Sequence, residues 1–157
     1  MPEKKLEQLG ITLPPAPEPV ASYVPAVIAG NLIYVSGQIP IREKNLMYEG
    51  IVGKDVSLEQ AREAARLCII NVLAVIKKEL GTLYRIKKIV RLSGYVASTP
   101  DFTQQPAVIN GASDLLVEVF GDTVGKHSRI AVGVASLPLN APVEIDLIAE
   151  VGEDEGD

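Results

Sequence analysis

The sequence is poor in the side chains that most often bind metals or form disulfides. It contains one cysteine, Cys68, and one histidine, His127, in 157 residues. A single cysteine excludes an intramolecular disulfide framework and a clustered-cysteine zinc site, and a single histidine excludes a metal site built on paired histidines. Cys68 lies on the apolar face of a predicted helix, where we expect a buried, inert thiol rather than a nucleophile. For His127 the simplest interpretation is a polar loop residue before a strand.

The chain has no excess of basic residues. Lys and Arg number 15 against 20 Asp and Glu, which gives a formal net charge of −5. Binding driven by nucleic-acid phosphates is therefore not expected. Four of the acids lie in the last six residues, so the rest of the chain carries a charge of −1. This pattern predicts a nearly neutral folded body with a solvated acidic tail over residues 152–157.

Long hydrophobic runs are also missing. The longest, residues 67–76, is interrupted by Asn71 and is too short to span a bilayer. The first ten residues are charged and contain no apolar signal-peptide core, so we predict a cytoplasmic protein. The mean hydropathy is nevertheless +0.21, which is high for one small domain. We therefore expect some apolar surface to be buried against another subunit.

The pattern of residues along the chain predicts an arm, one domain and a tail. Residues 1–19 are expected to form an extended arm without a helix, because four prolines occur in it (Pro14, Pro15, Pro17 and Pro19). Residues 20–151 are expected to form a single domain. Alternating apolar residues predict strands at 26–29 and 32–37, joined at Gly30-Asn31, and a polar loop is expected at 41–55.

A long helix is predicted over residues 58–80. Ser57 and Gln60 form a capping box at its start, and Gly81 suits its C-terminal end. A strand at 87–98 is expected to bury Val90, Leu92 and Val96. A second helix at 106–120 and strands at 129–135 and 143–151 complete the order β-β-α-β-α-β-β. This order predicts an α+β fold with a mixed or antiparallel sheet and both helices on one face.

Standard catalytic motifs are absent, but one arginine is a candidate binding residue. The sequence has no phosphate-binding glycine loop and no G-x-S-x-G motif. Arg129 should share a strand face with three small residues, Ala131, Gly133 and Ala135. Open space in front of the guanidinium would suit bidentate capture of a carboxylate. The alternative is a surface or interface salt bridge with Glu144 or Asp146.

Glu144 and Tyr23 are further candidates. Glu144, on the polar face of the last strand, is either a general base acting on water or a solvated carboxylate. Tyr23 follows the proline-rich segment and either packs over a cleft or anchors the arm.

Short motifs at these positions resemble one known family. They are Ser22-Tyr23-Val24, the V-S-G-Q-I-P stretch at 35–40, Asn110, Ser128-Arg129, Leu137-Pro138 and Val143-Glu144-Ile145. Their order and spacing resemble those of the reactive intermediate (enamine/imine) deaminase family, called Rid or YjgF-like, over roughly residues 20–150. The resemblance implies a chorismate-mutase-like fold and homotrimers with ligand clefts between subunits. It also implies hydrolysis of enamines and imines to 2-keto acids and ammonia, with no metal or organic cofactor.

The resemblance also implies roles for particular residues. Arg129 matches the arginine that binds the substrate carboxylate, and Glu144 matches the glutamate that places or activates water. Tyr23 matches the tyrosine at the cleft mouth, and Asn110 matches the helix asparagine near the neighbouring subunit's site. Ser36 and Gly37 match the loop that lines the cleft.

The sequence departs from the family pattern at three places. Ala131 stands where many members have cysteine, and the segments 101–110 and 121–128 are longer than in compact members, as in a longer-chain branch.

Two other functions compete with an imine deaminase. The same cleft would serve a protein that binds a small carboxylate, such as a 2-keto acid, as a sensor or regulator without turnover. Ribonuclease activity, with which some members of the family are labelled, is disfavoured by the nearly neutral body and by the single histidine. An iminium carbon is already electrophilic, so a positioned water and a fixed carboxylate can suffice for hydrolysis.

Overall fold

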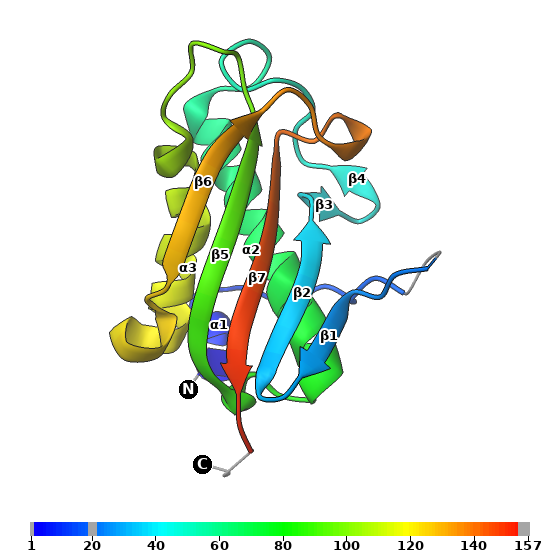
Figure 1. Cartoon of the computed structure of the whole chain (residues 1–157), viewed down its shortest axis with the longest axis vertical. Helices are drawn as coiled ribbons and strands as arrows, with labels where there is room; N and C mark the ends of the chain where they lie inside the picture. The colour runs from blue at the N-terminus through cyan, green and yellow to red at the C-terminus, as the bar shows by residue number, and fades with distance from the viewer. Residues whose placement is uncertain (1, 19–21, 154–157) are drawn as a thin grey trace.

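The computed structural model describes residues 2–18 and 22–153 (Figure 1). Its main sheet has five strands in the order β1-β2-β7-β5-β6. Only β5 and β6 run parallel, and the other neighbours are antiparallel, so the sheet is mixed. The strands are β1 (Ala26–Ala29), β2 (Leu32–Gln38), β5 (Ile86–Ala97), β6 (Ser128–Val134) and β7 (Val143–Val151).

Two long helices cover one face of this sheet and leave the other face open. They are α2 (Leu58–Leu80) and α3 (Gln105–Gly125), both behind the strands in Figure 1. In β7, the odd-numbered residues from Val143 to Val151 are buried beneath the helices, and the even-numbered residues are partly exposed. The predicted α+β fold, with its β-β-α-β-α-β-β order and both helices on one face, is confirmed.

Helix α2 has the predicted bounds because its two ends are encoded locally. The Ser57 side chain accepts a hydrogen bond from the Gln60 backbone, and the Gln60 side chain accepts one from the Ser57 backbone. Gly81 ends the helix in the left-handed conformation, with φ of 83°. Three alanines in its first half, Ala61, Ala64 and Ala65, are fully buried and allow close packing.

Helix α3 extends further than predicted, because a second short helical turn follows the main helix. Pro106 occupies the first turn, where its missing N–H costs nothing. Gly121, with φ of 81° and ψ of 170°, interrupts the helical backbone before the chain turns again up to Gly125. This extra turn leads into β6 and, as shown below, shapes the site.

Strand β5 buries Ile89 rather than the predicted Val90. Its pairing with β7 shifts between Ile89 and Arg91, so Val90 leaves the alternation and Leu92 and Val96 keep it. A bulge of this kind has no local sequence signal.

The expectation of a helix-free arm is wrong for its first part. Residues Pro2–Gln8 form a helix, α1, and the prolines occur only beyond it. Leu6 is 3% exposed and packs against the main core, which stabilises the fold by about 2 kcal/mol. The Glu3 side chain accepts hydrogen bonds from the Thr82 hydroxyl and the Leu83 backbone at the 3₁₀ turn η1 (Leu83–Arg85). Pro19 and residues 154–157 of the predicted tail lie outside the described residues, and the domain boundaries stay a prediction.

The predicted polar loop at 41–55 contains a small hairpin. Its strands, β3 (Ile41–Arg42) and β4 (Asn45–Leu46), are joined by Glu43 and Lys44, both with positive φ. Such turns normally contain Asn or Gly, so Glu-Lys carries no hairpin signal. A second 3₁₀ turn, η2 (Pro138–Asn140), precedes β7. Among the described residues, no helix combines the length and apolar character needed to cross a membrane.

Candidate functional site

The first group of predicted site residues lies where β2 ends and β7 begins. Gly37 lies directly against Glu144, and a Cβ at this glycine would be 2.5 Å from the Glu144 Oε2 atom. The pairing of β2 with β7 shifts between Val35 and Gln38, which allows this close approach. The structure therefore brings together Gly37 and Glu144, two residues widely separated in the sequence.

Glu144 is a half-buried carboxylate in the open sheet face. Burial raises its pKa above the usual value, and the nearby carboxylate of Asp146 adds to the increase. Among the described residues, no basic side chain forms an ion pair with it. A carboxyl group with a raised pKa is better matched to proton transfer near neutral pH than an ordinary glutamate is.

Ser36 connects this group to the segment that contains Tyr23. Its hydroxyl donates to the Val24 carbonyl at 2.7 Å, and its N–H donates to the Pro25 carbonyl at 2.8 Å. The adjacent Tyr23 is 59% exposed. Tyr23, Ser36, Gly37 and Glu144 therefore belong to one region of the molecule, and the tyrosine ring is available to a ligand or to a second subunit.

The loop after Gly37 is held by a buried amide on α2. The Asn71 side chain donates to the carbonyls of Ile39 and Ile41, both at 3.1 Å. Asn71 is 9% exposed, and the two carbonyls satisfy the hydrogens of its largely buried amide. Asn71, the polar residue within the apolar run 67–76, thus fixes the loop that follows Gly37.

The second group surrounds Arg129 at the other edge of the sheet. One guanidinium nitrogen, Nη1, donates to Asn110 Oδ1 at 2.8 Å and to Ser113 Oγ at 3.2 Å. Asn110 and Ser113 are three residues apart on α3 and so share one helix face. Two of the predicted site residues, Arg129 and Asn110, are therefore in direct contact within one chain.

Arg129 carries a half-buried positive charge with neutral partners. No carboxylate forms an ion pair with it within the described residues, so a salt bridge with Glu144 or Asp146 of the same chain is not observed. An interface salt bridge stays a prediction. The expectation of open space in front of its strand face is wrong. Arg129 pairs with the buried Leu92, so it lies on the helix-covered face, where α3 packs.

The two groups occupy opposite faces of the sheet in one chain. Glu144 pairs with Tyr95, on the open face, whereas Arg129 pairs with Leu92, on the covered face. Arg129 on β6 and Glu144 on β7 are also two strand spacings apart, roughly 10 Å, because β5 lies between these strands. A single chain does not bring Arg129 and Glu144 to one small ligand.

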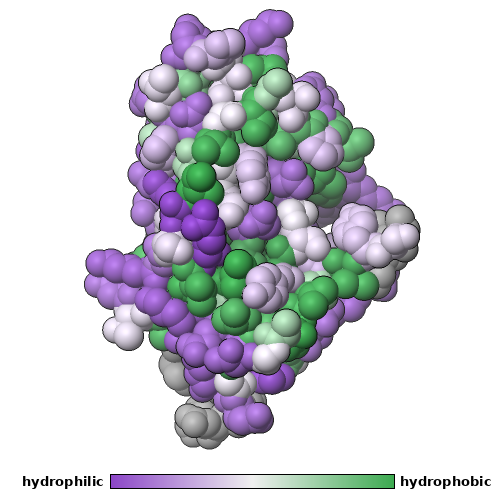
Figure 2. All heavy atoms as spheres, in the orientation of Figure 1, coloured by the Kyte–Doolittle hydropathy of each residue, from purple (hydrophilic) through white to green (hydrophobic). Residues whose placement is uncertain are grey.

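Apolar residues gather on the open face. Val27, Tyr34 and Ile148 are cross-strand neighbours in one row, and Ile130 is 42% exposed on β6. Figure 2, which views this face, shows hydrophobic residues over the lower part of the strands. Such a surface is suited to contact with another protein surface.

Ser113 and His127 form a hydrogen-bond network that the sequence did not predict. The Ser113 hydroxyl lies 2.9 Å from His127 Nε2, and His127 Nδ1 lies 2.7 Å from the Gly125 carbonyl. Burial lowers the His127 pKa, and the charges of Arg129 and Lys88 contribute to the decrease. In the sequence, the i, i+3 spacing of Asn110 and Ser113 is the one feature that indicates a shared helix face for such a network.

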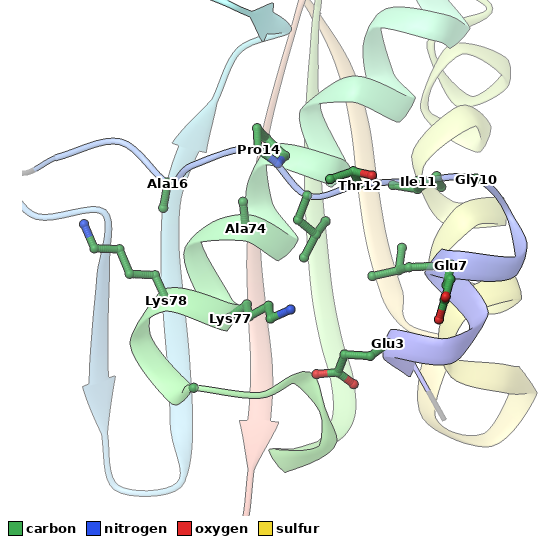
Figure 3. Close-up of a pocket in the computed structure, with 13 residues that line it drawn as sticks. Glu3, Glu7, Gly10, Ile11, Thr12, Pro14, Ala16, Ala74, Lys77 and Lys78 are labelled. Atoms are coloured by element: carbon green, nitrogen blue, oxygen red, sulfur yellow. The ribbon is translucent and has the colours of Figure 1, made fainter.

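Other polar candidates take no part in either group. Cys68 is fully buried, and burial raises its thiol pKa well above the usual value, as expected for an inert residue. A surface hollow of about 640 Å³ lies between the N-terminal segment and α2 (Figure 3). Lys77 and Glu3 both point toward it, but it contains none of the predicted site residues. The described residues contain no cluster of three or more His, Cys, Asp or Glu side chains placed to hold a metal.

The fold and the two residue groups define an α+β protein with an unneutralised arginine and a half-buried glutamate. The chain belongs to the family described as "YjgF/chorismate mutase-like, putative endoribonuclease", whose profile matches residues 3–151. The family's fold and the predicted Rid or YjgF-like resemblance are thereby confirmed.

Three similar proteins illustrate the range of names in this family. A crystal structure of an Agrobacterium tumefaciens protein of unknown function superposes with a TM-score of 0.87 at 49% identity, covering 95% of this chain and 90% of that one. Protein TCP17 of Trypanosoma cruzi is 43% identical over 93% of this chain and 91% of its own. A 2-iminobutanoate/2-iminopropanoate deaminase of Dermatophagoides farinae is 31% identical over 90% of this chain and 94% of its own.

Proposed function

We propose that the protein is a cofactor-independent hydrolase that converts enamine and imine intermediates to 2-keto acids and ammonia. The observation that carries this proposal is Arg129, a half-buried cation held only by neutral acceptors within the described residues. Such a charge is left for a ligand carboxylate to neutralise. The deaminase name of one relative supports the same substrate class.

The reaction needs one water and a proton acceptor. An enamine first gains a proton on carbon, which gives the iminium form. Water then adds to the iminium carbon while a base takes one of the water's protons, which gives a neutral carbinolamine. The base passes this proton to the amine nitrogen and takes the hydroxyl proton as the C–N bond breaks, so that ammonia leaves and the carbonyl forms. Glu144, whose pKa is raised by burial, is the proposed proton acceptor. Gly37 keeps room for its carboxylate, and Tyr23, Ser36 and Asn110 are proposed to line the cleft.

We further propose that the active form is a homotrimer with sites between subunits. Arg129 and Glu144 lie on opposite sheet faces, so a shared cleft must take Arg129 from one copy and Glu144 from a second copy. The apolar open face, with Val27, Tyr34 and Ile148, supports burial against a neighbouring copy. Native mass spectrometry is expected to give a trimer, and a monomer at assay concentration would contradict this assembly.

The activity is tested with imines generated in situ by an amino-acid oxidase. The wild-type protein is expected to accelerate imine decay, and Arg129→Ala to abolish the acceleration. Arg66→Ala, which removes another half-buried arginine, on α2, is the matched control and should keep the wild-type rate. If no imine decays faster with protein while a 2-keto acid binds tightly in calorimetry, the binding-protein alternative is favoured instead.

A complementation experiment tests whether two chains build the site. Arg129→Ala and Glu144→Gln are each expected to be inactive alone. Co-expressed, they form mixed trimers in which one cleft has both intact residues, so about a quarter of wild-type activity should return for equal amounts. Activity that stays absent in verified mixed trimers would show that one chain supplies both residues.

A further inference from the structure

The feature that the proposed reaction leaves unexplained is the chain of hydrogen bonds from Arg129 through Ser113 to His127. We propose that Ser113 and His127 are positioning residues that orient the Arg129 guanidinium for edge-on capture of a substrate carboxylate. This inference rests on the proposed function, because it assigns what holds the proposed carboxylate-binding residue in place.

With a neutral imidazole, the donors and acceptors along the chain admit one arrangement. The guanidinium has only donors, so Ser113 Oγ accepts from Arg129 at 3.2 Å. The Ser113 hydroxyl hydrogen then goes to His127 Nε2, 2.9 Å away, which must be unprotonated to accept it. His127 therefore carries its hydrogen on Nδ1 and donates it to the Gly125 carbonyl at 2.7 Å. The bond from the Ser113 hydroxyl to His127 Nε2 thus depends on a neutral imidazole whose hydrogen is on Nδ1.

The surroundings of His127 favour the neutral form. Burial is the largest cause of its lowered pKa, and the positive charges of Arg129 on β6 and Lys88 on β5 act in the same direction. The hydrogen bond to the Gly125 carbonyl opposes them. Ser113, which faces it from α3, is uncharged. A protonated ring would present a second donor to Ser113 and would leave the serine hydrogen without this acceptor.

The longer segment before Arg129 builds this arrangement. Gly121 breaks α3, and the following turn folds back on the helix so closely that a Cβ on Gly125 would be 2.6 Å from the Leu116 carbonyl oxygen. The Gly125 carbonyl is thereby directed at His127. The additional length at 121–128 thus has a role that is visible in the structure, namely to place the terminal acceptor of the chain.

These contacts leave one edge of the Arg129 guanidinium free. Both bonds to α3, at Asn110 and Ser113, use Nη1. Nε and Nη2 have no acceptor among the described residues, and together they form the flat two-donor edge that matches a carboxylate. Losing the Ser113 bond lets the guanidinium rotate about its remaining contact, which weakens capture without removing the charge.

The test combines kinetics with the chain's single histidine. Ser113→Ala and His127→Leu are expected to raise KM for the imine by about tenfold, the size expected for one charge-assisted hydrogen bond, and to change kcat less. Ser113→Thr, which keeps the hydroxyl, and His127→Gln, which keeps an acceptor, should restore most of the affinity. Ser128→Ala removes a nearby serine hydroxyl that bonds instead to the Val90 carbonyl, and is the matched control.

Nitrogen-15 NMR gives a readout that does not depend on turnover. Because the chain has one histidine, its ring signals need no assignment. The wild type is expected to show the Nδ1–H tautomer at pH 7, and Ser113→Ala to shift the Nε2 signal, because Nε2 loses the hydrogen bond from the serine hydroxyl while the Gly125 carbonyl still holds the hydrogen on Nδ1. An Nε2–H tautomer in the wild type, or an unchanged Nε2 signal with unchanged KM in Ser113→Ala, would overturn the inference. If the wild type hydrolyses no imine, only the proposed function fails, and calorimetry with a 2-keto acid replaces KM for the same variants.

Discussion

The closest packing in the candidate site is that of Gly37 against Glu144, and it can be perturbed by one methyl group. A Cβ at Gly37 would lie 2.5 Å from Glu144 Oε2, 3.0 Å from Cδ and 3.2 Å from Cγ. Ordinary van der Waals contact needs 3.4 Å or more. The carboxylate of Glu144 must therefore move by about 1 Å in Gly37→Ala. Gly37 is not among the glycines with positive φ, so the substitution strains no backbone angle.

We expect Gly37→Ala to separate folding from catalysis. The displaced group is the flexible end of a side chain, so the melting temperature should stay close to that of the wild type. The rate of imine hydrolysis should fall by about 100-fold, because a catalytic group misplaced by about 1 Å costs roughly that much. Both quantities are measured on the same preparation, by thermal unfolding and by the coupled oxidase assay.

A matched glycine and a double substitution test the reasoning. A Cβ on Gly152 would meet the side chain of Lys87 equally closely at the far end of β7, so Gly152→Ala should keep full activity. Since Gly37→Ala acts through the Glu144 carboxylate, it should not lower further the small residual rate that Glu144→Gln leaves, measured at high protein concentration. Full activity in Gly37→Ala, or the same fold loss in both backgrounds, would refute this account.

Three further predictions concern stability. Burial raises the folded-state pKa of Glu144, so ionisation of this side chain destabilises the fold as the pH rises above the ordinary pKa of a glutamate. Glu144→Gln should therefore raise the melting temperature at pH 7, and this gain should disappear near pH 4. Asn71→Ala removes the side-chain donor of the Ile41 carbonyl and one of the two donors of the Ile39 carbonyl, and should lower the unfolding free energy by about 1–3 kcal/mol, measured in urea. The lowered pKa of His127 predicts stability that is complete above about pH 6.5 and declines as pH falls below it, and His127→Gln should remove this decline.

The elements with local signals were predictable from the sequence. Helix α2 begins and ends as expected, because a capping box and a left-handed glycine are encoded within a few residues of its ends. The alternation in β7 likewise predicted which of its residues are buried. Helix α1 was not predicted, because the prolines at 14–19 indicate a segment without a helix, although residues 2–8 are compatible with one. The β3–β4 hairpin was not predicted, because Glu43 and Lys44 are unusual in such a turn.

The site was only partly predictable, because its geometry depends on strand order. Alternation correctly grouped Arg129 with small residues, but whether that face is open or covered is decided by where β6 lies in the sheet. Strand β6 is parallel to β5 at the edge, so α3 packs over the face that carries Arg129. The contact of His127 with Ser113 is likewise made by a turn that folds back on its own helix, a relationship without a periodic pattern.

The chain's two potentially reactive rare side chains are both unavailable for nucleophilic chemistry. The Cys68 thiol is fully buried, with a pKa raised well above its usual value, and donates toward the Val143 carbonyl. The ring nitrogens of His127 are both engaged, one by Ser113 and one by Gly125. The proposed chemistry is thus left to Arg129, which can bind charge, and Glu144, which can accept a proton. Neither activates an unreactive carbon, so a substrate of this pair must arrive already electrophilic, which is the property that distinguishes an imine from an amide or an ester.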